Sequence, residues 1–296
     1  MKATYLSWIL MLFLSFGAIA QENYTTDYKI KYELKFSMDT TNLEHTKTEK
    51  MYLFTGSEYG LFMNEFRVVA EKRLAELQNK GSAGDVSFGV NNGSNPADLN
   101  KAFFKNLQTG EVKVLQYFAD QDYLYLENQS ADYWEITEEI KEVSGYNAQK
   151  ATTSFAGRDY EAWFTMEIPI PDGPYVFHGL PGLIVELYDT EDDYHFTLAS
   201  IEKLEESKVW ELPKSKKLSK EKISKLQDKI KQNALMSSDY SYMVLNTSGI
   251  SGSTSTSFGK TTVKAEDRSG NKISNEELKR LYKQDLESRN NPIELE

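Results

Sequence analysis

Hydrophobic and polar residues alternate along residues 28–38. The polar positions are three lysines, a glutamate and a serine, and the apolar positions between them are Tyr28, Ile30, Tyr32, Leu34, Phe36 and Met38. A period of two places all the apolar side chains on one face of a β-strand. The pattern therefore predicts a strand that buries one face.

Shorter runs of the same kind follow in pairs, and a short polar turn separates the members of each pair. The pairs are 51–54 with 59–63, 112–118 with 123–127, 147–155 with 159–168, and 183–188 with 194–204. Such short gaps favour antiparallel hairpins over parallel crossovers. The chain is therefore expected to form a predominantly antiparallel curved sheet, either a meander or an incomplete barrel.

Helical spacing of apolar residues occurs in three places. The first segment is 65–78, the second runs from about 219 to 235, and the third begins with the capping-box pattern Ser274-x-x-Glu277. Between the last two, residues 246–259 are rich in serine, threonine and glycine, which predicts a flexible loop. The expected class is α+β, with about three helices packed at the face and edge of the sheet.

The sequence predicts three parts of the chain. Residues 1–20 are a leader, and residues 21–205 form an antiparallel β-rich core with one helix at about 65–78. Residues 206–296 add a helix, the flexible loop, a strand and a terminal helix to the same domain.

The leader has the composition of a secretory signal peptide. Lys2 gives a basic start, residues 6–16 are apolar, and Ala18-Ile19-Ala20 is a small-residue cleavage site. The apolar run is shorter than the ~20 residues that span a bilayer. We therefore expect a mature chain that begins near Gln21 and is located in the periplasm, with secretion beyond the outer membrane left open.

Composition limits the chemistry and the partners of the exported chain. The sequence contains no cysteine, so a lipid anchor through a lipobox cysteine, a disulfide and a thiolate zinc site are all excluded. Loss of Lys2 with the leader leaves 33 basic residues (34 − 1) against 45 acidic ones, a net charge of −12. An acidic surface repels phosphate backbones, so nucleic acid is not an expected partner, and neither is a stable membrane anchor.

Several motifs between residues 134 and 189 resemble those of the GLPGLI family. They include Trp134-Glu135-Ile136, Ser144-Gly145-Tyr146, Phe155-Ala156-Gly157-Arg158 and above all Gly179-Leu180-Pro181-Gly182-Leu183-Ile184, and the ending at residues 289–296 is similar too. The resemblance implies an envelope protein of Bacteroidetes-type Gram-negative bacteria without an established biochemical role. Ala148 departs from the family pattern, in which a cysteine is frequent. The expected architecture is also distantly similar to periplasmic lipoprotein-carrier half-barrels.

The hexapeptide at Gly179–Ile184 is expected to be a structural elbow. Four of the seven prolines, Pro169, Pro171, Pro174 and Pro181, fall within thirteen residues, so this segment cannot be a central strand. A phosphate cradle would need consecutive backbone N–H groups that lead into a helix, whereas here a proline interrupts them and a strand follows.

Motifs for catalysis, cofactor binding or metal binding are not found. A two-histidine, one-carboxylate site from His178, His195 and the acids at 186–193 is conceivable, but the spacing does not require it. The chain has no G-x-S-x-G elbow and no glycine-rich phosphate loop. No catalytic, cofactor or metal residue is therefore assigned.

Three functions remain, and the first two are the main alternatives. In the first, the protein is a non-enzymatic binding or carrier module. Its apolar groove would take an apolar ligand or an extended peptide and would be lined by Tyr28, Ile30, Tyr32, Leu34 and Phe36. In the second, it is an envelope interaction protein that docks on an outer-membrane (TonB-dependent) receptor, and a metal-binding envelope protein is a third possibility. A filled core with an exposed apolar patch would favour docking over carriage.

Overall fold

The computed structural model describes residues 23–37, 46–79, 101–118, 121–127, 133–236, 251–257 and 260–266, together with single positions between 271 and 294. The predicted signal peptide and His45 lie outside the described residues. No helix within the described ranges is long and apolar enough to cross a membrane.

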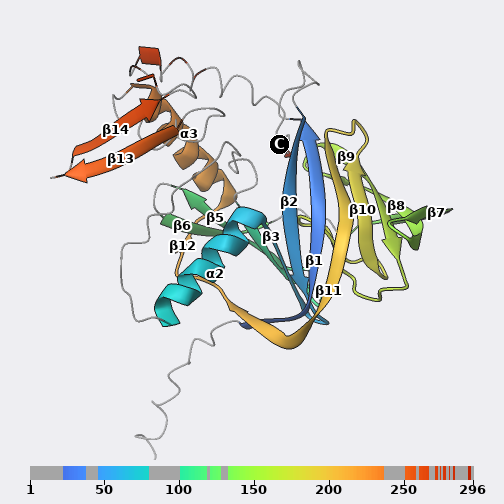
Figure 1. Ribbon diagram of the computed structural model, residues 1–296. Coiled ribbons are helices and arrows are strands. Elements are labelled where there is room, and N and C mark those ends of the chain that lie inside the picture. The colour runs from blue at the N-terminus through green and yellow to red at the C-terminus, as the bar shows by residue number, and fades with distance from the viewer. Residues whose placement is uncertain are drawn as a thin grey trace, which may run out of the picture.

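Twelve strands form one large open sheet (Figure 1). The first half of the chain supplies β1 (Asn23–Ser37), β2 (Thr46–Thr55), β3 (Tyr59–Asn64), β4 (Lys101–Asn106), β5 (Val112–Phe118) and β6 (Gln121–Leu126). The second half supplies β7 (Glu135–Val143), β8 (Tyr146–Phe155), β9 (Arg158–Thr165), β10 (Leu183–Asp189), β11 (Tyr194–Glu211) and the short β12 (Lys216–Lys217).

The strand order is β12-β6-β5-β4-β3-β2-β1-β11-β10-β9-β8-β7. Two antiparallel meanders therefore meet at the β1–β11 pair, and only the pairing of β12 with β6 is parallel. The predicted class, an α+β fold built on a curved and mostly antiparallel sheet, is confirmed.

Two helices have described bounds, α2 (Glu65–Asn79) and α3 (Lys220–Met236), where the sequence predicts about three. Most of the third predicted helix lies outside the described residues. At its predicted start, the Ser274 hydroxyl accepts a hydrogen bond of 3.2 Å from the Glu277 backbone N–H, as in a capping box.

Part of the predicted flexible loop at 246–259 is a strand instead. Residues Ser251–Ser257 form β13, which pairs with β14 (Lys260–Glu266) in a separate two-stranded antiparallel sheet. Composition predicts a loop because serine and glycine pack poorly, but the backbone hydrogen bonds of a hairpin do not depend on apolar side chains. Residues 246–250 lie outside the described ranges.

Alternating side chains of the first half of the sheet enter two different hydrophobic clusters. On β3, for example, Phe62 belongs to the larger cluster, and its neighbours Leu61 and Met63 belong to a smaller one. Val68 of α2 packs against the smaller cluster. Strands β3 and β4 are thus buried on both faces, whereas β1 and β2 also carry exposed polar side chains.

The connector between β9 and β10, residues 166–182, fills the concave side of the sheet. The Tyr175 ring lies 4.4 Å from Phe103 of β4, and the Phe177 ring lies 4.7 Å from Tyr160 of β9 and 5.6 Å from Phe155 of β8, as measured between ring centroids. The connector therefore packs against strands from both meanders, and the main core forms around it.

A buried ion pair fixes the connector to β4. The ammonium group of Lys105 pairs with the carboxylate of Asp172, and both side chains are fully buried. Lys105 Nζ also donates to the carbonyl oxygens of Gly173 at 2.5 Å and Phe177 at 3.4 Å. Burial lowers the pKa of Lys105, and the neighbouring Asp172 carboxylate opposes that shift. Because all three acceptors of Lys105 lie in the connector, Lys105 is the main polar contact between the connector and β4.

The hexapeptide at Gly179–Ile184 leads the connector into β10. Gly179 has a φ of 90°, a value that L side chains rarely adopt. At Gly182 the reason for glycine is different, because an added Cβ would lie 2.1 Å from the Thr165 carbonyl oxygen. The register between β9 and β10 shifts between Ile184 and Glu186, and the Ile184 N–H bonds to the Asp172 carbonyl at 3.0 Å.

This register shift changes which side chains are buried. The sequence predicts Leu183, Val185 and Leu187 on one face of the strand and Ile184 on the other. In the structure all four belong to the main core, and Ile184 Cδ1 lies against Gly173 of the connector. The alternation predicted for Ile184 is therefore wrong, because an irregularity in the ladder turns its side chain toward the connector.

We expect Gly182→Val to lower the free energy of unfolding by about 1–3 kcal/mol, a fall of ~2–4 °C in melting temperature for each kcal/mol. The new side chain would push β9 away from the start of β10. Thermal unfolding measures the effect. Gly145→Asn is the control, because a Cβ at Gly145 meets nothing within 4 Å and asparagine tolerates its φ of 84°. Equal melting of Gly182→Val and the parent would contradict the close approach.

Candidate interaction surface

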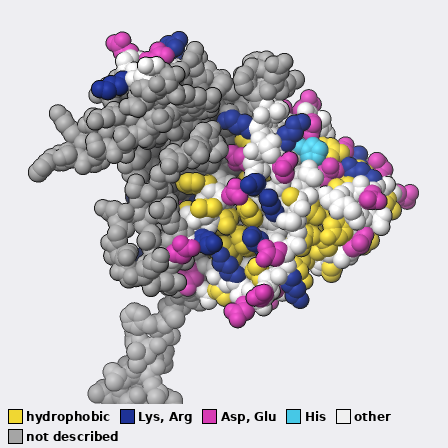
Figure 2. Space-filling view, viewed as in Figure 1, with side chains coloured by type: hydrophobic (Ala, Val, Ile, Leu, Met, Phe, Trp, Pro, Cys, Tyr) yellow, Lys and Arg dark blue, Asp and Glu magenta, His cyan; other side chains and the backbone are white. Residues whose placement is uncertain are grey.

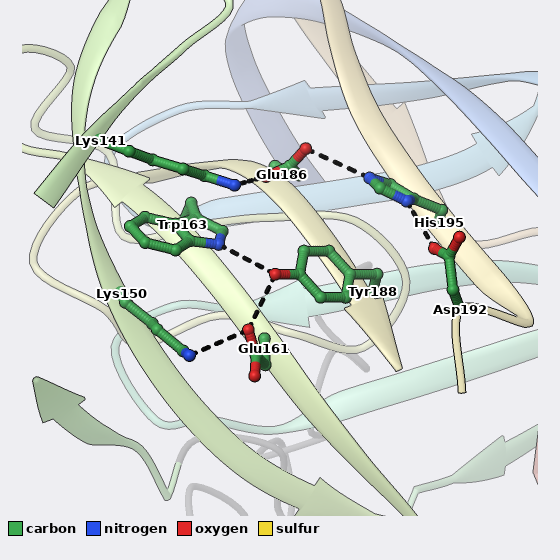
Figure 3. A network of polar contacts seen from close by, with 8 residues as sticks. All are labelled: Lys141, Lys150, Glu161, Trp163, Glu186, Tyr188, Asp192 and His195. Atoms are coloured by element: carbon green, nitrogen blue, oxygen red, sulfur yellow. Dashed lines mark hydrogen bonds and ion pairs between the residues drawn. The ribbon is translucent and has the colours of Figure 1, made fainter. Parts of the chain in front are cut away.

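The face of β7 to β11 that points away from the core carries a cluster of charged and aromatic side chains, which we call the outer-face cluster (Figure 3). Its members are Lys141 of β7, Lys150 of β8, Glu161 and Trp163 of β9, Glu186 and Tyr188 of β10, His195 of β11, and Asp192 in the turn before β11. Strand pairing brings them together, since Glu186 is opposite Trp163 and Tyr188 is opposite both Glu161 and His195.

One end of the outer-face cluster is built around Glu186. Its carboxylate accepts from Lys141 Nζ at 2.6 Å and lies 3.2 Å from His195 Nε2, while His195 Nδ1 lies 2.7 Å from Asp192. The hydrogen bond with His195, followed by that with Lys141, holds the pKa of Glu186 below its usual range. The same bond with Glu186 raises the pKa of His195, and Asp192 adds to the shift.

The other end is built around Glu161. The Tyr188 hydroxyl donates to it at 2.8 Å and Lys150 Nζ lies 3.1 Å away. Burial acts to raise the pKa of Glu161, but the bonds from Tyr188 and Lys150 outweigh burial and lower it. Neither Glu161 nor Glu186 has the raised pKa that a general acid needs.

The two ends are joined through Trp163. The ammonium of Lys141 lies 4.1 Å from the centre of the Trp163 ring, a cation–π contact, and the indole N–H donates to the Tyr188 hydroxyl at 3.4 Å. Trp163 itself is buried. The charged side chains of the outer-face cluster are therefore already paired with one another. Their contacts support β7, the edge strand beside them.

Strand β7 forms an edge of the sheet and exposes large apolar side chains. Ile136 is 49% exposed and Ile140 is 69% exposed, and Tyr133, just before the strand, is 79% exposed. Ile136 and Ile140 pair with β8 residues whose β9 partners are the core residues Ala162 and Phe164. The two isoleucines thus extend the core face of the sheet to its edge. In Figure 2, hydrophobic side chains gather in the middle of the face shown and again toward the right, the side on which Figure 1 places β7 to β10.

The same strand is acidic. It carries four glutamates and one lysine, and of the glutamates only Glu139 forms an ion pair within the described part of the chain, 3.6 Å from Lys150. The other three are Glu135, Glu138 and Glu142. The pairing of β7 with β8 is also irregular between Ile136 and Ile140. We call Tyr133, Ile136, Ile140 and these three glutamates the β7 surface.

The residues considered for metal binding do not meet. His178 is buried in the connector, where its Nδ1 lies 2.8 Å from the Val176 carbonyl oxygen, while His195 lies in the outer-face cluster. Within the described ranges no group of three or more histidine, aspartate or glutamate side chains has an arrangement that could hold a metal ion. In the acidic turn, Asp189 and Asp193 instead bind Arg158 Nη1, at 2.6 and 3.1 Å.

The five residues proposed to line a groove share one face, but they are packed. Ile30, Tyr32 and Leu34 are 0% exposed and Phe36 is 2% exposed. Tyr28 is half-buried against the same core. The Tyr32 hydroxyl donates to the Ile184 carbonyl oxygen at 2.7 Å, so this row reaches the hexapeptide directly.

Sequence reasoning missed the Lys105–Asp172 pair and the role of Trp163. Lys105 follows Phe103 at a spacing of two, which puts both side chains on the face of β4 that enters the core. This spacing was the sequence signal that the lysine is buried. Trp163 and Lys141 come from strands that are not sequence neighbours, and no local pattern links them.

Comparison with known proteins adds a family similarity. Residues 156–186 match the family described as "Protein of unknown function (Porph_ging)". The matched stretch runs from β9 through the connector into β10 and includes the Gly179–Ile184 hexapeptide. No curated protein matches the sequence.

Two solved structures of PNGF-II, in space groups P21 and C2, are similar to the chain. Each is 16% identical in sequence, with a TM-score of 0.45 over 68% of this chain. The matches cover 33% and 32% of the PNGF-II chains, so this chain spans about a third of their length.

Proposed function

We propose that the protein is an exported, GLPGLI-type envelope protein that works by docking on a partner protein through the β7 surface. The observation that carries the proposal is the exposure of Tyr133, Ile136 and Ile140. They are three of the eight large hydrophobic side chains that the described residues expose, and they lie within eight positions of one another. Exposed apolar groups gathered at one edge are typical of a protein–protein contact.

The chemistry of the β7 surface indicates what the partner must offer. Glu135, Glu138 and Glu142 are acidic groups without ion pairs in the described chain, beside two exposed isoleucines. An extended partner segment with basic and apolar side chains would neutralise the carboxylates and cover the isoleucines. The irregular pairing of β7 and its charges discourage nonspecific strand addition, so recognition would depend on side chains.

The packing of the core also supports docking over carriage. The carrier prediction requires space beneath the row that runs from Tyr28 to Phe36, and the connector aromatics fill the concave side of the sheet. A periplasmic location and a TonB-dependent receptor as the docking partner remain predictions from the sequence.

Site-specific photocrosslinking in the producing cells tests the proposal. A photoreactive amino acid in place of Ile140 should give one predominant protein adduct, and the same group in place of Val69 on α2 should not. Val69 is a matched control because it is apolar and 58% exposed. The double reversal Glu138→Lys with Glu142→Lys should reduce the Ile140 adduct at least about fivefold, because a basic partner would then be repelled.

Mass spectrometry of the adduct identifies the partner, and a TonB-dependent receptor would match the sequence prediction. An equal yield from both positions, or no adduct at Ile140, would refute docking through β7. An adduct that withstands the charge reversal would refute a basic partner.

A further inference from the structure

Ile293 and Glu294 occupy a slot between β4, β9, the connector and α3. The Ile293 side chain is buried in the main core, and its carbonyl oxygen accepts a hydrogen bond of 3.3 Å from the Tyr160 hydroxyl. These two residues are thus bound by groups that are far away in the sequence.

The Glu294 carboxylate has three partners, two lysines and a tyrosine. Its carboxylate lies 3.2 Å from Lys101 Nζ and 3.0 Å from Lys220 Nζ, and the Tyr175 hydroxyl donates to it. Only 11% of its side chain is exposed. Burial acts to raise the pKa of Glu294, but Lys101 and Lys220 reverse this and lower it to about 2. The slot therefore selects an ionised carboxylate.

The slot has contacts that do not depend on its occupant. Tyr175 packs on Phe103 and Tyr160 packs on Phe177, at 4.4 and 4.7 Å between ring centroids. Lys220 Nζ also pairs with Glu127 at 2.9 Å. Three of the four polar groups would therefore keep their positions if Ile293 and Glu294 left, as in a preorganised binding site.

We propose that this slot is a peptide-binding site for a segment in which a branched apolar residue precedes a glutamate, and that Ile293 and Glu294 fill it in cis. The apolar pocket takes the first side chain, and the two lysines with Tyr175 take the carboxylate. An Ile-Glu segment of another protein competes with the chain's own segment. The site is separate from β7, so the proposal does not depend on the docking function.

The full chain with Glu294→Lys provides the test. The substitution places a third ammonium group between Lys101 and Lys220 and drives the chain's own segment out of the slot. The probe is a fluorescent synthetic peptide with the sequence of residues 291–296, followed by anisotropy. We expect the variant to bind the probe at least about tenfold more tightly than the wild-type chain, in which a tethered competitor has a high effective concentration.

Two controls test the chemistry of the slot. A probe with glutamine at the position of Glu294 should bind at least about tenfold more weakly, because the charge-assisted bonds are lost. Adding Lys101→Met to Glu294→Lys should weaken binding similarly, since Lys101 forms its described ion pair with Glu294 alone.

Near-UV circular dichroism reports whether each variant is folded. If Glu294→Lys does not fold, Glu294→Gln replaces it, because it keeps the shape of the side chain, and it should still bind the probe more tightly than wild type. A folded variant that binds no probe, or a wild-type chain that binds as tightly, would overturn the proposal.

Discussion

Lys105→Met is expected to lower the free energy of unfolding by about 3–5 kcal/mol, because it leaves the Asp172 carboxylate buried without its counter-ion. Asp172 Oδ2 already faces Gly60 without a hydrogen-bond partner among the described residues, so no neighbour there replaces the lysine. Such a loss is a large part of the stability of an ordinary domain. Chemical denaturation followed by tryptophan fluorescence measures it.

The controls separate loss of charge pairing from loss of packing. Lys203→Met, at an exposed position of β11, should change stability by no more than about 0.5 kcal/mol. Adding Asp172→Asn to Lys105→Met should recover part of the loss, since a neutral amide costs less to bury than an unpaired carboxylate. If Lys105→Met were as stable as the parent, the Lys105–Asp172 pair would not be what holds the connector.

Tyr32→Ala is expected to cost about 3–5 kcal/mol, as large truncations in a packed core do. The ring is fully buried, 6.4 Å from the Phe62 ring between centroids, and the hydroxyl bond to Ile184 is also lost. Tyr32→Phe keeps the ring and removes only that bond, so a loss of about 1–3 kcal/mol is expected. Thermal and chemical unfolding of the two variants measure the difference.

The same residue decides between solid core and carrier groove. An environment-sensitive apolar dye should not bind the wild-type protein at micromolar concentration if the row from Tyr28 to Phe36 is solid core. Dye binding that lipid displaces, together with a small effect of Tyr32→Ala, would favour the carrier prediction over docking.

Local patterns predict the elements of this fold well. The alternation along residues 28–38 corresponds to β1, and the helical spacing at 65–78 corresponds to α2, Glu65–Asn79. The signal is strong for β1 because one face of the strand is buried and the other is exposed to water. In α2 the spacing predicts the helix but not its burial, since Phe66 is 39% exposed and Val69 is 58% exposed.

The sequence did not predict the contacts between side chains that are far apart in the chain. Lys105 meets Asp172, Trp163 meets Lys141, and Glu294 meets Lys101 and Lys220, each across strands or loops whose order in the sheet has no local signature. The β7 surface was missed for a related reason, since an isoleucine in a strand is expected to be buried unless that strand is known to be an edge.

The pairing of β1 with β11 has a consequence for how the chain folds. Tyr24 of β1 pairs with Trp210 of β11. The β1–β11 ladder therefore cannot form until nearly the whole chain from β1 to β11 is available. During synthesis the N-terminal part of the chain emerges first, so the meander from β1 to β6 can form early. One edge of β1 then still lacks its backbone hydrogen-bond partners. Nonlocal pairing of this kind slows folding, and an open edge invites aggregation. The return of β11 is therefore the step at which a newly made chain is most exposed to misassembly and most in need of a chaperone.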